Sequence, residues 1–299
     1  MSLPLHLAIG AFDGVHLGHR AVLHSAREAA RADGGIVGVL TYDPHPSKVL
    51  RPESSVPLIF TRAQKDDRLT EAGAQLIHHE KFDRAHAGIE AADFPQWLQA
   101  TFPHLKSLHV GSNFQYGRGR AGNGETLIAH SAPAGLVVRL VSAVSLGDET
   151  VSSSRIRQCL ASGDLALANA MLLRPYEAEG VIIGGRRLGR TLGFPTVNLA
   201  WEPELKPAYG VYAVEVIFQG EALPAVANYG QRPTVESGPV APLLEAHVLR
   251  GAAPTTGDAV RVRWVRRLRA EQKFADLAAL QAQIAKDSAA AKQALGLLA

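Results

Sequence analysis

Cysteine is almost absent from this sequence. The chain of 299 residues holds one, Cys159, so no disulfide can form within it. Chains without disulfides are typical of reducing compartments, and we therefore expect a cytoplasmic location. Cys159 falls at an apolar position of an expected helix, with no activating side chain near it in the sequence. The prediction for this thiol is a buried structural role.

Long hydrophobic runs are missing as well. No stretch approaches the roughly 18 consecutive apolar residues of a transmembrane helix. The first residues, MSLPLHLAIGAFDG, lack the basic region and the cleavage site of a signal peptide, so we expect neither a membrane anchor nor a leader. The composition, 46% hydrophobic and 20% charged, is that of a globular protein with one large or two ordinary domains.

The excess of positive over negative charge is small too. The formal net charge is +3, which is too small by itself to indicate a nucleic-acid partner. Arginines do gather at residues 261–269, and a basic nucleic-acid-binding protein is the alternative from a different functional class. However, Arg261-Val262-Arg263-Trp264 alternates as a strand with one solvated face does. We expect no nucleic-acid partner, and a monomer or weak homo-oligomer.

Residues 1–173 alternate between strand-like and helix-like segments. Residues 5–12 are mostly apolar and end in a glycine-rich turn, residues 18–33 have helical spacing, and residues 36–42 are apolar and β-branched. Strand, helix and strand in succession predict a βαβ unit of a parallel sheet. Further strands are expected at 106–110 and 136–144, and a helix at 155–173 with Ser153 or Ser154 as its cap.

The pattern changes after Pro175. Short β-branched segments follow, separated by glycine and proline, which predicts an all-β domain in the form of a small closed barrel, because such strands must pair among themselves. Residues 274–298 are rich in alanine and leucine with helical periodicity. We expect the domain boundary between residues 173 and 177. The expected strands are 180–183, 210–218, 223–228, 244–249 and 260–265.

The densest motif of the first half is GAFDGVHLGH at residues 10–19, where the first strand turns into a helix. Such a turn presents backbone N–H groups and the positive end of the helix dipole to a phosphate. His16 and His19 share a face once the helix has begun, and Gly18 allows a ligand to approach the backbone closely. Two imidazoles beside phosphorus can donate hydrogen bonds to charge that builds in a transition state. No third ligand cluster accompanies them, so zinc is not indicated.

A second concentration of glycine and arginine lies at residues 184–198, directly after an expected strand. A loop of this composition suits phosphates. Thr196 and Asn198 are two residues apart, so their side chains face one side of an extended segment. Hard oxygen ligands of this kind suit Mg²⁺. From the residues alone, a hairpin with polar turn residues remains the other interpretation.

Taken together, these motifs resemble those of the bacterial bifunctional riboflavin kinase/FAD synthetases, and the resemblance covers nearly the whole chain. It implies an α/β nucleotidyltransferase domain of the HxGH type, with a Rossmann-like parallel sheet, at residues 1–173. A small antiparallel Greek-key β-barrel with a C-terminal helix is implied for residues 174–299. The resembling segments are residues 10–19, 42–46, 111–122, 152–157, 189–199, 228–234, 244–247 and 269–274.

The resemblance also implies roles for individual residues. It implies that ATP, riboflavin, FMN and FAD are substrates or products, and that Mg²⁺ is held by Thr196 and Asn198. The catalytic residues so implied are His16, His19, Asn113, Arg155 and Glu245. The implied nucleotide- and flavin-binding residues are Gly10, Phe12, Asp13, Gly14, Gly18, Asn113, Ser152, Ser153, Ser154, Arg157, Gly185, Gly189, Arg190, Gly193, Pro195, Thr196, Asn198, Asn228 and Arg232.

The two implied reactions make different chemical demands. An FMN phosphate is already ionised at neutral pH, so it attacks the α-phosphorus of ATP without a general base. The 5′-hydroxyl of riboflavin must lose a proton to attack the γ-phosphorus, and in the family the acidic residue of the 244–247 motif, here Glu245, accepts it. An HxGH enzyme for another phosphorylated substrate is the alternative, although such an enzyme needs no barrel. The sequence departs from the family pattern at 184–187, at Val197 and at 251–257.

Overall fold

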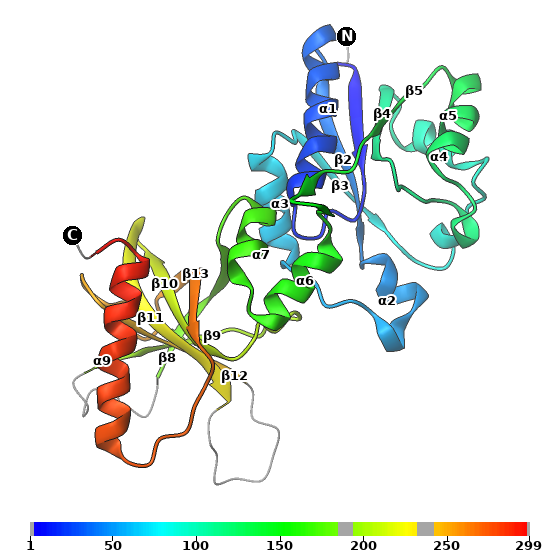
Figure 1. The fold of residues 1–299 in the computed structure, drawn as a ribbon. Coiled ribbons are helices and arrows are strands. Elements are labelled where there is room, and N and C mark those ends of the chain that lie inside the picture. The colour runs from blue at the N-terminus through cyan, green and yellow to red at the C-terminus, as the bar shows by residue number, and fades with distance from the viewer. Residues whose placement is uncertain (1–2, 185–193, 232–241, 298–299) are drawn as a thin grey trace. The chain divides into compact units, whose positions relative to one another are not determined.

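The computed structural model describes residues 3–184, 194–231 and 242–297 (Figure 1). The chain divides into two compact units, residues 1–153 and residues 154–299. No helix among the described residues is both long and apolar enough to cross a membrane. Each unit has its own sheet and its own core, and each is described by itself below.

The first unit is built on a five-stranded parallel sheet in the order β3-β2-β1-β4-β5. The predicted βαβ unit and parallel sheet are therefore confirmed. The strand order reverses beside β1, because the chain moves from β1 outward to β3 and then returns to place β4 on the other side of β1. The strands are β1 (Leu5–Ile9), β2 (Ile36–Asp43), β3 (Leu76–Lys81), β4 (Leu105–Gly111) and β5 (Val137–Val141).

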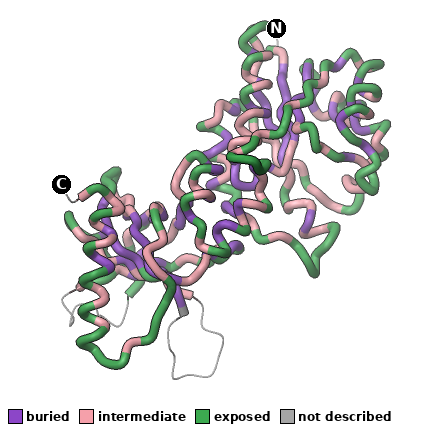
Figure 2. Tube along the Cα trace, viewed as in Figure 1, coloured by how far each residue is buried: buried purple, intermediate pink, exposed green. Residues whose placement is uncertain are grey.

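Helices cover both faces of this sheet, and each face has its own apolar core. Residues of α1 and α3 pack on one face, and residues of α4 and α5 on the other. Figure 2 shows the buried strands as the purple centre of the unit. The helices are α1 (Leu17–Asp33), α2 (Pro46–Leu50), α3 (Arg62–Glu71), α4 (Phe94–Thr101) and α5 (Gly124–Ser131), with short 3₁₀ turns η1 (Pro52–Ser54), η2 (His86–Gly88), η3 (Arg118–Arg120) and η4 (Ala132–Ala134) and a small hairpin of β6 (Ser145–Leu146) and β7 (Glu149–Thr150).

A chain of buried polar side chains joins β1, β4 and α1. His6 lies between Asp33, 2.9 Å from Nε2, and Ser107, 2.7 Å from Nδ1. Ser107 in turn lies 2.8 Å from Nε2 of His109, whose Nδ1 is 2.8 Å from Ser25. When both imidazoles are neutral, every group has a partner: each serine donates to an Nδ1, and each Nε2–H donates onward, ending at the Asp33 carboxylate. These hydrogen bonds matter for stability, because a buried polar group without a partner would destabilise the folded chain.

The second unit is built around a closed barrel of six antiparallel strands in the order β10-β11-β12-β9-β8-β13. The predicted barrel is confirmed, and β9 to β12 follow the Greek-key order, since β9 lies beside β12. The sequence patterns did not identify β9 as a strand. The strands are β8 (Tyr176–Ile183), β9 (Val197–Ala200), β10 (Gly210–Phe218), β11 (Glu221–Gln231), β12 (Pro242–Val248) and β13 (Ala259–Arg269).

The strand β13 alternates as predicted. Val262 and Trp264 are buried, whereas Arg261 and Arg263 are only half-buried on the other side. Both arginines are ion-paired: Arg263 Nε lies 3.0 Å from Glu177, and Arg261 Nε lies 3.0 Å from Glu179. Further along, Arg269 pairs with Asp287 and Arg267 donates to the backbone carbonyls of Ser162 and Tyr209. These contacts give most of the arginine cluster a structural explanation and do not favour the nucleic-acid alternative.

One helix prediction was wrong. Residues 155–173 form two helices, α6 (Ser153–Ser162) and α7 (Leu165–Leu172), instead of one. Gly163 adopts a left-handed conformation with φ of 85°, which ends α6, and Asp164 then caps α7 by accepting a hydrogen bond from Leu167 N–H at 3.2 Å. The predicted buried position of Cys159, in α6, is confirmed.

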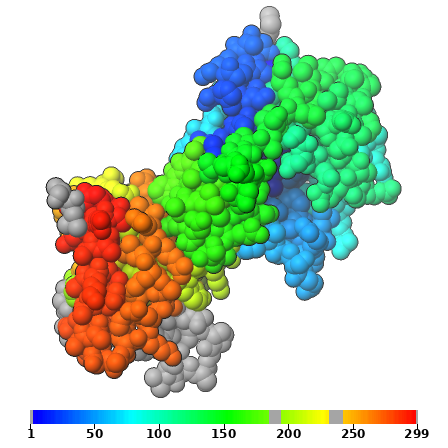
Figure 3. Space-filling model, in the orientation of Figure 1, coloured from blue at the N-terminus to red at the C-terminus, as the bar shows by residue number. Residues whose placement is uncertain are grey.

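Among the described residues, the helices α6, α7 and α9 lie in the second unit. The helix α7 packs against β8 and β13, and α9 (Leu277–Ala294) packs against β10, β11 and β13. Figure 3 shows α9, in red, on the surface of the barrel. Compactness thus groups residues 154–173 with the barrel, whereas we expected the functional boundary after residue 173. That boundary stays a prediction.

The buried hydrogen-bond chain predicts a loss of stability in acid. Burial, with smaller contributions from His6 and Arg139, lowers the pKa of His109 from 6.5 to about 4. The unfolded chain therefore binds more protons here than the folded chain as the pH falls between those values. We expect the free energy of unfolding of the first unit to fall by about 1 kcal/mol per pH unit in that window.

Hydrogen exchange of the β1 and β4 amides, corrected for the intrinsic effect of pH, measures this change. The variant His109→Gln retains a donor and an acceptor but does not titrate, so its exchange should depend less on pH than that of the unchanged protein. An equal dependence in both proteins would contradict the assignment to His109.

Candidate active sites

The turn between β1 and α1 contains the predicted GAFDGVHLGH motif. Phe12, Gly14 and Val15 all have positive φ angles, of 51°, 86° and 39°, so the chain bends sharply before the helix begins. His16 is the N-cap of α1, and its Nδ1 accepts a hydrogen bond from Gly18 N–H at 3.2 Å. A neutral His16 therefore carries its hydrogen on Nε2.

The two histidines of the motif lie together on one side of the turn, as the motif predicted, and their rings are stacked. The ring centroids of His16 and His19 are 3.7 Å apart and their planes differ by 18°, while Phe12 packs edge-on against His19 at 5.2 Å. Gly18 suits this packing, because a Cβ there would lie 3.2 Å from the His16 ring, a tight contact that the ring would have to shift to accommodate. The turn thus holds both imidazoles in one place at the start of α1.

The environment keeps His19 neutral. Burial, and then the nearby charges of His16 and Lys65, holds the pKa of His19 well below its ordinary value of 6.5. Nδ1 of His19 is buried and has no hydrogen-bond partner among the described residues. A neutral imidazole has one N–H to donate, and it takes up no further proton at physiological pH.

The same turn is anchored from two distant parts of the chain. The buried carboxylate of Asp13 accepts a hydrogen bond from Ile59 N–H at 3.0 Å, and the Asp13 carbonyl accepts one from Ser153 Oγ at 2.8 Å. Two of the predicted binding residues, Asp13 and Ser153, are thereby brought together although 140 positions separate them. Ser152 precedes Ser153 and is half-buried.

Asn113 follows the strand next to β1. Because β1 and β4 are parallel and pair through Ala8 and His109, their carboxyl ends lie at one edge of the sheet (Figure 1). The strand order reverses at this edge, which is where open α/β sheets bind their ligands. Gly10 follows β1, and the exposed Asn113 follows β4. The topology therefore brings the histidine turn and the Asn113 loop to one edge.

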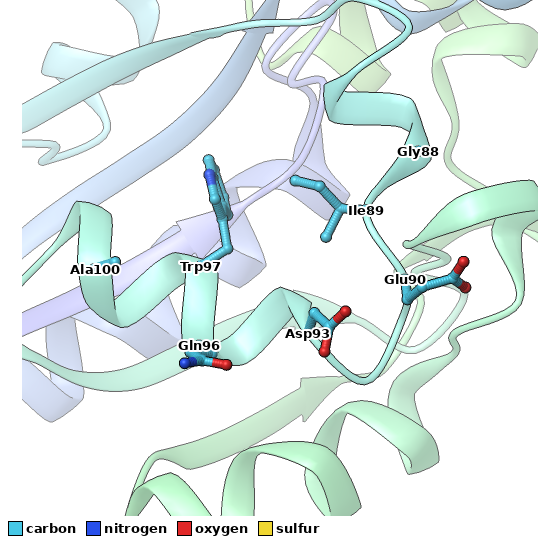
Figure 4. Close-up of a pocket in the computed structure, with 7 residues that line it drawn as sticks. All are labelled: Gly88, Ile89, Glu90, Asp93, Gln96, Trp97 and Ala100. Carbon is cyan, nitrogen blue, oxygen red and sulfur yellow. The ribbon is translucent and has the colours of Figure 1, made fainter.

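Aromatic residues that the sequence patterns did not single out lie along the Asn113 loop. Phe114 and Tyr116 have ring centroids 5.8 Å apart with nearly parallel planes, and Phe94 packs on Tyr116 at 5.0 Å. Nearby on α4, a shallow pocket of about 390 Å³ contains none of the predicted site residues (Figure 4). It is lined by Gly88, Ile89, Glu90, Asp93, Gln96, Trp97 and Ala100.

In the barrel, three predicted residues are direct neighbours on adjacent strands. Glu245 on β12 pairs with Asn228 on β11 and with Asn198 on β9. Its sequence neighbours Leu244 and Ala246 are buried, so Glu245 belongs to the opposite face of the strand. Cross-strand neighbours have Cβ atoms about 5 Å apart, which is close enough for their side chains to act on one ligand.

The residues predicted to hold Mg²⁺ fit a hard cation. Asn198 is 5% exposed, and its Oδ1 has no hydrogen-bond partner among the described residues. An oxygen in that state is a suitable ligand. Thr196 is exposed, and the preceding Pro195 accepts a hydrogen bond from His247 Nδ1 at 2.8 Å. In the part of the chain that the structure describes, no group of three or more His, Cys, Asp or Glu side chains forms a separate metal site.

The contacts described above do not connect the other predicted site residues with either site. Ser154, Arg155 and Arg157 lie on α6, in the second unit. Gly185, Gly189, Arg190, Gly193 and Arg232 lie outside the described residues, as does most of the 184–187 segment in which the sequence departs from the family pattern. The roles of all these residues stay predictions.

Comparison with known proteins bears on both sites. A family model described as FAD synthetase matches residues 3–155, and one described as riboflavin kinase matches residues 172–295. A bifunctional riboflavin kinase/FMN adenylyltransferase of Escherichia coli is 38% identical over 293 residues, which cover 97% of this chain and 93% of that protein. The chain belongs to the bifunctional riboflavin kinase/FMN adenylyltransferase family. The family resemblance of the sequence motifs is thereby confirmed.

Two further proteins are similar to this chain over nearly its whole length. The bifunctional riboflavin kinase/FMN adenylyltransferase of Bacillus subtilis is 34% identical and covers 94% of this chain and 89% of its own length. A solved structure from Streptococcus pneumoniae, described as a macrolide-efflux protein, has a TM-score of 0.88 and 27% identity, with 97% of this chain and 94% of that chain covered. The whole two-unit chain therefore has counterparts in both sequence and structure.

Proposed function

We propose that this protein makes FAD from riboflavin in two reactions that each consume ATP. Residues 174–299 phosphorylate riboflavin to FMN, and residues 1–173 adenylylate FMN to FAD and pyrophosphate. The observation that carries the proposal is the match of two family models, one for each activity, to separate parts of the chain, residues 3–155 and 172–295. Each part holds one of the two motif groups.

For adenylylation, a phosphate oxygen of FMN forms a bond to the α-phosphorus of ATP, and the bond from that phosphorus to pyrophosphate breaks. The attacking phosphate is already ionised, so catalysis consists of positioning and charge stabilisation. The stacked His16 and His19 lie at the start of α1, where backbone N–H groups also point outward, and His19 is held neutral by its environment. Asn113, at the same edge of the sheet, completes the group that we assign to the phosphates.

For phosphorylation, Glu245 accepts the proton of the riboflavin 5′-hydroxyl as that oxygen attacks the γ-phosphorus, and the bond to ADP breaks. Its neighbours Asn198 and Asn228 lie on either side of it across the sheet. Asn198 and Thr196 are the proposed Mg²⁺ ligands. A bound Mg²⁺ neutralises charge on the transferred phosphoryl group.

The direct test uses the full-length protein with riboflavin, ATP and MgCl₂, followed by chromatographic separation of the flavins. FMN should form first and FAD second, and FMN added in place of riboflavin should give FAD and pyrophosphate. If FMN is not adenylylated while another phosphorylated substrate is, the protein is an HxGH enzyme of different specificity.

Replacing either histidine separates the two activities. His16→Ala or His19→Ala should lower FMN adenylylation by about 10²-fold, the usual effect of removing one transition-state donor. Riboflavin phosphorylation in the same sample should be unchanged. His24→Ala is a matched control, because His24 is an exposed residue of the same helix. Equal loss of both activities in His19→Ala would indicate a folding defect and contradict this role.

Replacing the carboxylate in the barrel should affect the two activities in the opposite way. Glu245→Gln retains size and hydrogen bonding but cannot accept a proton, so FMN formation should fall by about 10²- to 10⁴-fold. Adenylylation of added FMN should persist. Glu221→Gln, at an exposed position of β11, is the control for loss of a barrel carboxylate. A Glu245→Gln enzyme with the phosphorylation rate of the unchanged protein would show that Glu245 is not the base.

A further inference from the structure

Lys65 reaches the histidine turn from a different part of the fold. It lies in α3, and its ammonium donates a hydrogen bond to Thr41 Oγ1 at 3.1 Å. Thr41, fully buried in β2, donates in turn to the carbonyl of Ala11 at 3.0 Å. Ala11 belongs to the turn between β1 and α1. Two hydrogen bonds in series therefore hold the Lys65 ammonium beside the backbone that carries His16 and His19.

This ammonium has no counter-ion within the described chain. Two other cations of the unit do have carboxylate partners: Arg62 pairs with Asp43 at 2.8 Å, and Lys106 pairs with Asp33 at 2.9 Å. No carboxylate oxygen of the described residues lies within ion-pair distance of Lys65 Nζ, although the side chain is half-buried. An ammonium has three donors, and Thr41 takes one. The remaining donors, on an ammonium without a direct ion pair, suit an anionic ligand.

The electrostatics place Lys65 and His19 in one environment. Burial lowers the pKa of Lys65, whereas the charges of Asp66, Asp13 and Asp43 raise it. The charge of Lys65 in turn contributes to the lowered pKa of His19. A positive charge that acts on His19 also acts on a phosphate held against His19.

We propose that Lys65 is a further catalytic residue of FMN adenylylation, and that its ammonium contacts the polyphosphate of ATP and stabilises the departing pyrophosphate. This inference rests on the proposed function of the first unit. As the bond between the α-phosphorus and the bridging oxygen breaks, negative charge accumulates on pyrophosphate. A fixed ammonium stabilises the transition state, in which this charge has built up, more than it stabilises the ground state. No proton needs to move.

The test compares Lys65→Met and Lys65→Arg in the full-length protein, with Lys106→Met as the matched control. Lys65→Met should lower adenylylation by about 10²-fold. Lys65→Arg, which keeps the charge, should recover most of that loss. Riboflavin phosphorylation by the same samples reports whether the proteins are folded. The control removes a lysine whose ammonium is already paired with Asp33, so both activities should persist.

Two further measurements distinguish contact with phosphate from a structural role. Pyrophosphate binding, measured by calorimetry, should weaken at least tenfold in Lys65→Met. The alkaline limb of the adenylylation pH profile should move to higher pH in Lys65→Arg, because a guanidinium stays charged where an ammonium deprotonates.

An unchanged protein that forms no FAD from FMN would overturn the proposed function itself. If the unchanged protein forms FAD, three results would each overturn the role of Lys65 alone. The first is a near-normal rate of adenylylation by Lys65→Met. The second is a pyrophosphate affinity and an alkaline limb of the pH profile that neither substitution changes. The third is a loss of adenylylation in Lys106→Met as large as that in Lys65→Met.

Discussion

The parallel pairing of β1 with β4 is the constraint on which the first site depends. Parallel strands end at the same edge of a sheet, so the turn after β1 and the loop after β4 emerge together only while these strands remain neighbours. The buried bonds between His6, Ser107 and His109 lie across that pair, and Ser25 connects it to α1. The helix that begins at the histidine turn is therefore fixed to the two strands whose ends form the proposed site.

In the barrel, strand register plays the corresponding part. Glu245 meets Asn228 and Asn198 because β12 pairs in one register with both neighbours. A shift of one residue would turn Glu245 toward the face on which Leu244 and Ala246 are buried, and would remove the carboxylate from the asparagines. The packed interior, with Tyr229 and Trp264 in contact, specifies the register, and the chemistry on the other face depends on it.

Local patterns predicted most of the fold, and the failures have physical causes. The strand at 210–218 was predicted with its observed bounds, because its apolar run ends at turn residues on both sides. The break at Gly163 was missed although Ser-Gly-Asp is a turn signal, since apolar spacing continues through it. The short β9 is a strand mainly because β8 and β12 pair with it. The histidine turn could be predicted from its motif, whereas the place of Lys65 beside it could not, since that position depends on how α3 and β2 pack.

The location of uncompensated charge is more informative than its amount. The arginines of β13 are the most conspicuous basic feature of the sequence, but Arg261 and Arg263 face glutamates of the same barrel and stabilise it. Lys65 has no ion-pair partner among the described residues, and it lies beside the histidine turn. A half-buried cation that is already ion-paired gains little interaction free energy when an anionic ligand binds. A half-buried cation without an ion pair gains more, because the ligand becomes its partner. Ion pairing within the fold, rather than net charge, therefore distinguishes structural cations from those available to the phosphates of a nucleotide.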